Sequence, residues 1–230
     1  PVPPLNLVGD FGGGALYLAF GMMASMLRAQ KTGEGDVVDA AMVDGAASLM
    51  AMFFGLSAAG RWTDNRGENI LDTGAPWYDV YETKDGKYFA IGAIETKFFA
   101  VLADRIGLTE EDRKRQYDVS YWPTLKARIA DIMKTKTRDE WSAILEGTDA
   151  CATPVLSIAE APTHPHMAAR KTFENRDGVV QPAAAPRFAR AGAPTIAPPP
   201  ETGAQTQELL ALAGYSEPEI AAMLASGVAV

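Results

Sequence analysis

A single carboxylate stands in an otherwise uncharged stretch of the chain, and it is the residue best suited to chemistry. Asp10 follows the apolar segment "PVPPLNLVG" and precedes "FGGG", and no other charged side chain occurs before Arg28. A carboxylate beside the free N–H groups of a helix start can act as a base or a nucleophile, while those donors stabilise an oxyanion. The same position also suits a structural N-cap, so both roles stay open for Asp10.

The glycines after Asp10 are candidates for ligand contact. Gly12 and Gly13 have no side chain, so a bulky ligand could approach the backbone closely there. They do not form a dinucleotide-binding fingerprint, because no strand precedes them in a βαβ unit.

Other polar groups lie where binding residues often occur. Glu95 ends the apolar run "YFAIGAIE", where it could cap a helix or point into a pocket. Asp72 and Tyr78 lie in "NILDTGAPWYDVY", a Gly- and Pro-containing loop whose turn chemistry explains them equally well. His164 and His166 have no other His or Cys nearby, so we expect no metal site. Cys151 is expected to be a small buried residue.

Helices and one hairpin must position these groups. An apolar helix is predicted from Asp10 to a stop at Gly33, and a second over residues 42–59; both are apolar on nearly all sides and should be buried. Asp85-Gly86 predicts the turn of a hairpin, and a helix should begin near Glu95. Further elements are predicted by a proline near the start of "WPTLKARIADIM", by a capping box in "TRDEWSAILEG", by the apolar strand "ACATPVLS" and by a second capping box in the C-terminal "SEPE".

We therefore expect an α/β protein in four parts. Residues 1–60 hold large-domain helices with Asp10, residues 61–77 form a linker loop, residues 78–160 form a small α+β domain, and residues 161–230 return to the large domain with two terminal helices.

Composition excludes several functions. The net charge of −8 disfavours a nucleic-acid partner. One cysteine permits no intrachain disulfide, which favours a reducing compartment. The uncharged run from residue 11 to 27 is shorter than a membrane span of about 20 residues, and no secretory signal is visible. A cytoplasmic location is expected, or a peroxisomal or mitochondrial one in a eukaryote.

Long, specific blocks resemble the α-methylacyl-CoA racemases of the family III CoA-transferase superfamily. These blocks are "VPPLNLVGDFGGG", "GAPWYDVYETKDGKY", "HPHMAAR" and "LLALAGYSEPEIAAMLASGV". The resemblance implies a Rossmann-like large domain with a smaller α+β domain, in an interlocked dimer. It also implies inversion of the carbon α to a CoA thioester by two bases and an enolate, within fatty acid and lipid metabolism. CoA is then part of the substrate, and no cofactor or metal is needed.

The resemblance also implies roles for individual residues. Asp10 matches a catalytic base, and Glu95 matches an active-site group that supports the bases by hydrogen bonding. The positions that match the lining of the acyl or thioester pocket are Asn6, Leu71, Tyr78 and Ile94, and we add Gly12, Gly13 and Asp72 to the substrate-binding candidates.

One block of the family pattern has no match. The second base is a histidine in "GHDxNY", and neither His164 nor His166 lies in such a block. We therefore expect this chain to be the C-terminal portion of a racemase, weak or inactive alone, whose apolar helices are covered by a missing N-terminal half or by a second copy. The alternatives are a CoA transferase that uses Asp10 as its nucleophile, and a non-catalytic assembly or binding module.

Overall fold

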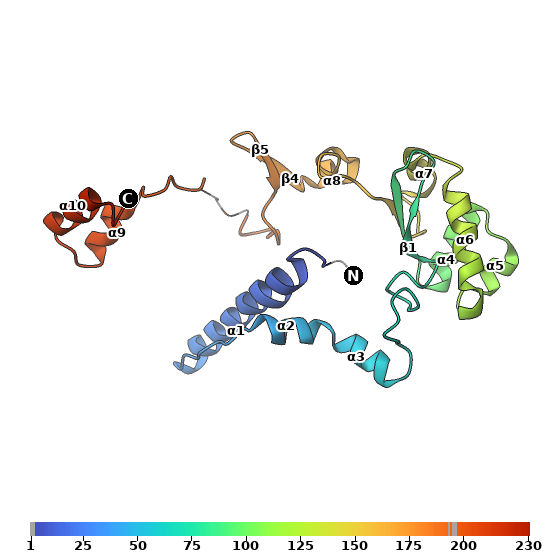
Figure 1. Ribbon diagram of the computed structural model, residues 1–230, viewed down its shortest axis with the longest axis horizontal. Coiled ribbons are helices and arrows are strands. Elements are labelled where there is room, and N and C mark those ends of the chain that lie inside the picture. Colours follow the sequence, from blue (N-terminus) through green and yellow to red (C-terminus); the bar gives the residue numbers. More distant parts are fainter. Residues whose placement is uncertain (1–2, 193, 195–196) are drawn as a thin grey trace. The chain divides into compact units, whose positions relative to one another are not determined.

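The computed structural model describes residues 3–192, 194 and 197–230, and Figure 1 shows its elements. The chain forms two compact units, Pro1–Leu156 and Ser157–Val230, which are described one at a time. The helices of the first unit are η1 (Leu7–Ala15), α1 (Leu16–Thr32), α2 (Met42–Leu49), α3 (Ala51–Ala58), α4 (Thr96–Ile106), α5 (Glu110–Lys114), η2 (Val119–Tyr121), α6 (Trp122–Met133) and α7 (Arg138–Leu145). Its strands are β1 (Tyr78–Glu82), β2 (Tyr88–Gly92) and β3 (Ala152–Pro154).

The N-terminal helices form the first part of this unit. The π-helix η1 continues directly into α1, which ends at Gly33 in the left-handed conformation, with φ 77°. This confirms the predicted stop, because glycine adopts that conformation without the Cβ clash of other residues. α2 packs against η1 where Gly13 and Gly45 meet, and a Cβ atom added to Gly45 would overlap the carbonyl oxygen of Gly13. The two glycines thus allow the two backbones to touch.

The prediction that these apolar helices are buried was wrong for the described residues of this chain. None of the described residues of α1 is buried, and Phe20 is 76% exposed. The second predicted helix is interrupted at Met50, which separates α2 from α3. The helical segment Leu7–Thr32 is long and apolar enough to cross a membrane by length and composition, with a mean hydropathy of 1.3, although a core helix of a globular protein meets the same criterion. Its apolar surface therefore lacks cover from the described residues.

The α+β part is packed in the ordinary way. Strands β1, β2 and β3 form an antiparallel sheet in that order, and Gly86 occupies the hairpin turn with φ 71°, as the sequence predicts. α6 contacts β1, and α7 contacts β2 and β3. The fully buried side chains at the centre of this core are Trp77, Phe89, Phe99, Leu102, Leu125, Ile129, Met133 and Trp141. The sheet therefore has one face covered by helices and one open face.

A buried carboxylate fixes the helices of this part. Asp112 has no exposed surface, and it accepts hydrogen bonds from the N–H and hydroxyl of Thr109, the hydroxyl of Tyr121 and the guanidinium of Arg128. Burial raises the pKa of Asp112, but the hydrogen bonds from Arg128, Thr109 and Tyr121 outweigh it and hold the pKa far below the ordinary range. Asp112 is therefore an ionised structural residue that links α5, η2 and α6.

Predicted helix signals hold in both units. Pro123 lies in the first turn of α6, and Thr137 with Glu140 forms the capping box of α7. The second unit contains η3 (Ala161–Thr163), α8 (Pro165–Arg170), the antiparallel hairpin of β4 (Phe173–Arg176) and β5 (Val179–Pro182), α9 (Thr206–Leu212) and α10 (Glu217–Ser226). Ser216 and Glu219 form the predicted capping box of α10.

The division of the chain into four functional parts stays a prediction.

Candidate active site

Asp10 is the exposed fourth residue of η1, in its first turn. The N-cap of this helix is Asn6, so the predicted capping role of Asp10 was wrong. The helix begins earlier because the backbone N–H of Leu7 already donates to Pro4, and that of Phe11 donates to Asn6 at 3.2 Å. Such i→i+5 turns occur frequently at functional sites, and a carboxylate is favoured near a helix N-terminus. Asp10 thus lies in the first turn of η1 without acting as its N-cap.

The other predicted ligand residues of this segment differ in exposure: Asn6 is exposed, whereas Gly13 is buried. Asn6 is exposed, and its side chain makes no capping hydrogen bond. Gly13 is buried against α2, and a Cβ there would lie 2.7 Å from the backbone nitrogen of Ala46. An added Cβ on Gly12 would lie 3.1 Å from the carbonyl oxygen of Leu7. The structure thus gives Gly13 a packing function, and ligand contact by Gly12 or Gly13 stays a prediction.

Asp72 closes the loop that leads into β1. Its carboxylate accepts hydrogen bonds from the backbone N–H of Gly67 at 3.1 Å and from both the N–H and the side-chain amide of Asn69, at 2.8 and 2.6 Å. Partial burial raises the pKa of Asp72, but these hydrogen bonds, chiefly that of the Asn69 side chain, outweigh it and lower the pKa. Leu71 next to it is half-buried. Asp72 therefore orders the loop, and contact with substrate stays a prediction.

Glu95 is the N-cap residue of α4, which confirms the predicted helix start. Its backbone carbonyl accepts from the N–H groups of Phe98 and Phe99, both at 2.9 Å, while its exposed side chain makes no capping hydrogen bond. The carbonyl of Ile94 accepts from the hydroxyl of Tyr117 at 2.6 Å and the side-chain amide of Gln116 at 2.9 Å. The backbone at Glu95 is thus anchored, and its carboxylate is left available to solvent or ligand.

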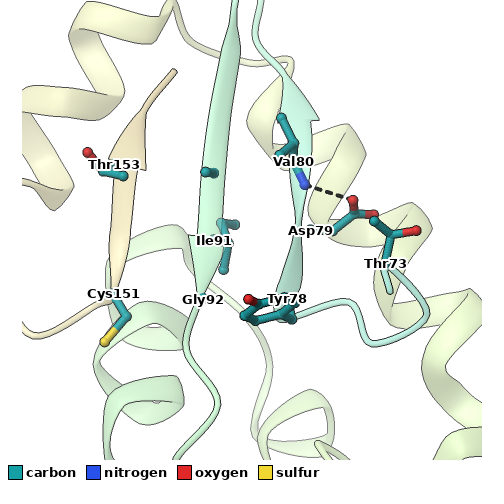
Figure 2. Close-up of a pocket in the computed structure, with 9 residues that line it drawn as sticks. Thr73, Tyr78, Asp79, Val80, Ile91, Gly92, Cys151 and Thr153 are labelled. Atoms are coloured by element: carbon teal, nitrogen blue, oxygen red, sulfur yellow. Dashed lines mark hydrogen bonds between the residues drawn. The ribbon is translucent and has the colours of Figure 1, made fainter. Parts of the chain in front are cut away.

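A cavity of about 390 Å³ lies along strands β1 and β2 and includes Gly92, three residues before Glu95. Its lining, drawn in Figure 2, consists of Thr73, Tyr78, Asp79, Val80, Ala90, Ile91, Gly92, Cys151 and Thr153. Of the predicted site residues, Tyr78 contributes to this lining. The period-2 alternation of strands could have added Val80, Ala90 and Gly92 to the prediction, because Tyr78 pairs with Gly92 and Val80 with Ala90.

Cys151 is a lining residue that the sequence did not identify. It is exposed rather than buried, it has φ 47°, and its carbonyl accepts from the N–H of Gly92 at 2.8 Å. Partial burial raises the pKa of its thiol, as do the nearby negative charges of Glu95 and Asp149.

The candidate catalytic residues are not joined by direct contacts. Among the described residues, no hydrogen bond or ion pair links Asp10 to Glu95, so their action at one site stays a prediction. His164 is the N-cap of α8, with His166 in its first turn. Within the described ranges, no group of three His, Cys, Asp or Glu residues is placed to hold a metal ion.

Comparisons with known proteins connect these features to one family. A model described as CoA-transferase family III matches residues 1–206. The protein named alpha-methylacyl-CoA racemase of Mus musculus is 40% identical over 222 residues, which cover 96% of this chain and 58% of that protein. The racemase of Homo sapiens is 39% identical over 224 residues, again 96% and 58%. The (R)-2-hydroxy-4-methylpentanoate CoA-transferase of Clostridioides difficile is 27% identical over 231 residues, 94% of this chain and 57% of that protein.

Solved structures show the same fold. Rv3272 from M. tuberculosis superposes with a TM-score of 0.67 at 23% identity, covering 89% of this chain and 55% of that one. A CAIB/BAIF family protein from Brucella suis gives 0.68 at 20% identity, covering 92% and 56%. The chain thus spans somewhat more than half the length of each of these relatives.

Proposed function

We propose that this chain, which belongs to CoA-transferase family III, functions in racemisation. The reaction inverts the α-carbon of 2-methylacyl-CoA thioesters. The observation that carries this proposal is the 40% identity to an alpha-methylacyl-CoA racemase over 96% of the chain, against 27% for a CoA-transferase of the same family. With such a substrate we expect the reaction to belong to fatty acid and lipid metabolism, and its compartment stays a prediction.

The chemistry of this reaction needs a base on each face of the α-carbon. The thioester carbonyl makes the α-proton removable, because the carbanion that forms is delocalised onto oxygen as an enolate. Asp10, in the first turn of η1, takes the proton on one face. Glu95 supports the exchange by hydrogen bonding. Return of a proton to the opposite face completes the inversion, and CoA enters only as part of the substrate.

The opposite-face base is expected outside these 230 residues. His164 and His166 belong to the start of α8 in the second unit, in a motif different from that of the family's second base. The exposed apolar surface of η1, α1 and α3 supports the same view, since such surface is normally covered in a globular assembly. We expect a second copy or the remaining part of a full-length racemase to cover it and to complete the site.

CoA transfer is the second candidate, because the similar C. difficile protein is named as a CoA-transferase. In that reaction the Asp10 carboxylate attacks the thioester carbonyl and expels the CoA thiolate, which forms a mixed anhydride. The CoA thiolate then attacks the aspartyl carbonyl, which releases the donor acid and leaves an aspartyl-CoA thioester. An acceptor carboxylate attacks this thioester, expels the thiolate and forms a second anhydride, and the thiolate attacks the acceptor's carbonyl to give the new acyl-CoA and free Asp10. This alternative predicts a covalent acyl adduct, whereas racemisation predicts none.

Solvent isotope exchange separates the two candidates. The chain is incubated with (2R)- and (2S)-2-methylacyl-CoA in D₂O, and mass spectrometry follows α-deuterium while chiral analysis follows inversion. We expect slow deuterium incorporation, little inversion by this chain alone, and no hydroxamate on the Asp10 side chain when hydroxylamine is added. A hydroxamate derived from Asp10 without deuterium incorporation would support transfer instead. Rapid inversion would contradict the expectation that a second base is missing.

A further inference from the structure

The peptide that precedes Glu95 is held by two side chains from one turn. The carbonyl oxygen of Ile94 accepts a hydrogen bond from the hydroxyl of Tyr117 at 2.6 Å and another from the amide nitrogen of Gln116 at 2.9 Å. Two donors satisfy both lone pairs of a carbonyl oxygen. The carboxylate of Glu95, by contrast, makes no hydrogen bond or ion pair among the described residues. The position of this carboxylate therefore depends on the backbone that carries it.

The turn that supplies these two donors is fixed in the core of the α+β part. The backbone carbonyl of Gln116 accepts from the indole nitrogens of Trp77 at 3.0 Å and Trp122 at 2.9 Å. The ring of Tyr117 packs edge-on against that of Trp77, with 5.6 Å between their centroids. Gln116 itself is 2% exposed. The donors thus come from well-packed residues, and such support is what holds a functional group in one place.

The side-chain amide of Gln116 acts through its nitrogen. This nitrogen faces the carbonyl oxygens of Ile94 and Ala93, the latter at 3.4 Å, and the reverse orientation would turn the amide oxygen toward those two oxygens. Among the described residues, no group donates to the buried oxygen of this amide. Burying an acceptor without a donor costs stability, so an apolar side chain of the same size would suit the core better. What the glutamine adds here is the hydrogen bond to the peptide before Glu95.

We propose that Gln116 and Tyr117 are positioning residues, which set the place of the Glu95 carboxylate through the carbonyl of Ile94. This inference rests on the proposed function and deepens it, because Glu95 supports the proton exchange there. The two hydrogen bonds fix the plane of the Ile94–Glu95 peptide, and Glu95 then begins α4 as its N-cap. Small displacements of a group that takes part in a reaction lower the rate steeply.

Cys151 supplies a readout that does not depend on activity. It is the only cysteine of the chain and it is exposed, so the pH dependence of its alkylation rate gives the pKa of its thiol. Burial raises this pKa, and the negative charge of Glu95 raises it further. Glu95→Gln should therefore lower the thiol pKa in the parent chain. The size of that change measures how the Glu95 carboxylate is held relative to the thiol.

The experiment measures this change of the thiol pKa in the full chain with and without the two donors. We expect Glu95→Gln to change the pKa less in the double variant Gln116→Met/Tyr117→Phe, because a carboxylate that moves freely averages over larger distances from the thiol. Tyr117→Phe alone, at a half-exposed ring, should show part of this loss and serves if the double variant does not fold. Tyr88→Phe is the matched control, because Tyr88 is 50% exposed against 53% for Tyr117, and its hydroxyl makes no hydrogen bond among the described residues.

Deuterium incorporation into a 2-methylacyl-CoA is measured in the same variants. The double variant should lower kcat for incorporation by about tenfold or more and leave KM unchanged, because it displaces a supporting group without removing a substrate contact. Tyr88→Phe should leave both kcat and KM unchanged. Far-ultraviolet circular dichroism and urea unfolding show that each variant is folded, and a purely structural role would lower stability without this split between kcat and KM.

The outcomes separate this inference from the proposed function. A thiol pKa that Glu95→Gln leaves unchanged in the parent chain, or changes equally in the double variant, overturns the positioning role even if deuterium is incorporated. A folded double variant that loses the pKa change but keeps the parent kcat also overturns it, because the place of Glu95 would then not matter to the exchange. Loss of the pKa change, with no deuterium incorporation even in the parent chain, would retain the positioning of Glu95 and contradict the racemase chemistry.

Discussion

Two regions of the first unit differ in the burial of their apolar side chains. In the α+β part, α4, α6 and α7 direct Phe99, Leu125 and Trp141 into a closed core, whereas the apolar side chains of α1 are exposed. Both regions have ordinary helix signals, so the difference lies in the partners that surround them. The α+β part thus has a closed core of its own, while the apolar side chains of η1 and α1 lie exposed among the described residues.

Core truncation gives the largest expected contrast between the regions. Phe99→Ala should reduce the free energy of unfolding of the α+β part by about 3–5 kcal/mol, because it leaves a cavity among close-packed side chains. Phe20→Ala removes the same ring from a residue that is 76% exposed. This variant should change the free energy of unfolding by less than about 0.5 kcal/mol. Urea unfolding followed by tryptophan fluorescence measures both, because Trp77, Trp122 and Trp141 lie in the α+β core. Equal effects would show that α1 is covered within the chain.

Acid titration tests the role of the buried Asp112 in the α+β part. The pKa of Asp112 is lower in the folded chain than in the unfolded chain, so its contribution to stability is present above about pH 4 and is lost as pH falls toward the folded pKa. Asp112→Asn should lower stability at pH 7 by roughly 2–3 kcal/mol, and the difference from the parent chain should shrink in acid. Glu111→Gln, at an exposed neighbour, is the control. A variant whose deficit is independent of pH would contradict this role for Asp112.

Glycine contacts test the tight junction between η1 and α2. Gly45→Ala should force α2 away from η1, at a cost of about 1–3 kcal/mol, because its Cβ would overlap the carbonyl of Gly13. Gly55→Ala in α3 meets no atom within 4 Å and should stabilise its helix by up to about 1 kcal/mol. Amide hydrogen exchange of η1 and α2 distinguishes them. Unchanged protection in Gly45→Ala would mean that the junction is not formed in solution.

Local signals predicted much of the fold. The Asp85-Gly86 turn, the stop at Gly33 and the capping boxes of α7 and α10 each depend on a few adjacent residues, and the structure confirms all of them. Features that depend on distant partners were missed. Gly13 meets Gly45 across 32 positions of sequence, and Asp112 is buried only because Tyr121 and Arg128 from later elements satisfy it.

For the candidate site, the structure gives the positions of the predicted residues, and their roles stay predictions. Tyr78 and Glu95 were identified from sequence blocks, and the structure places them at the cavity and at the helix start beside it. The exposed Cys151 was not predicted, because its position follows from the pairing of its carbonyl with Gly92 rather than from its own neighbours. The early start of η1, which removes Asp10 from the cap, depends on backbone hydrogen bonds that no local residue preference indicates.

The central claim is that Asp10 is a proton-transferring base, and one isotope measurement tests it most directly. Solvent deuterium incorporation at the α-carbon of a 2-methylacyl-CoA is compared in the parent chain, Asp10→Asn and Asp44→Asn, the last being an exposed carboxylate in the first turn of α2. We predict that Asp10→Asn lowers the rate by about 100-fold or more and that Asp44→Asn leaves it unchanged. Equal rates in the parent chain and Asp10→Asn would contradict the account.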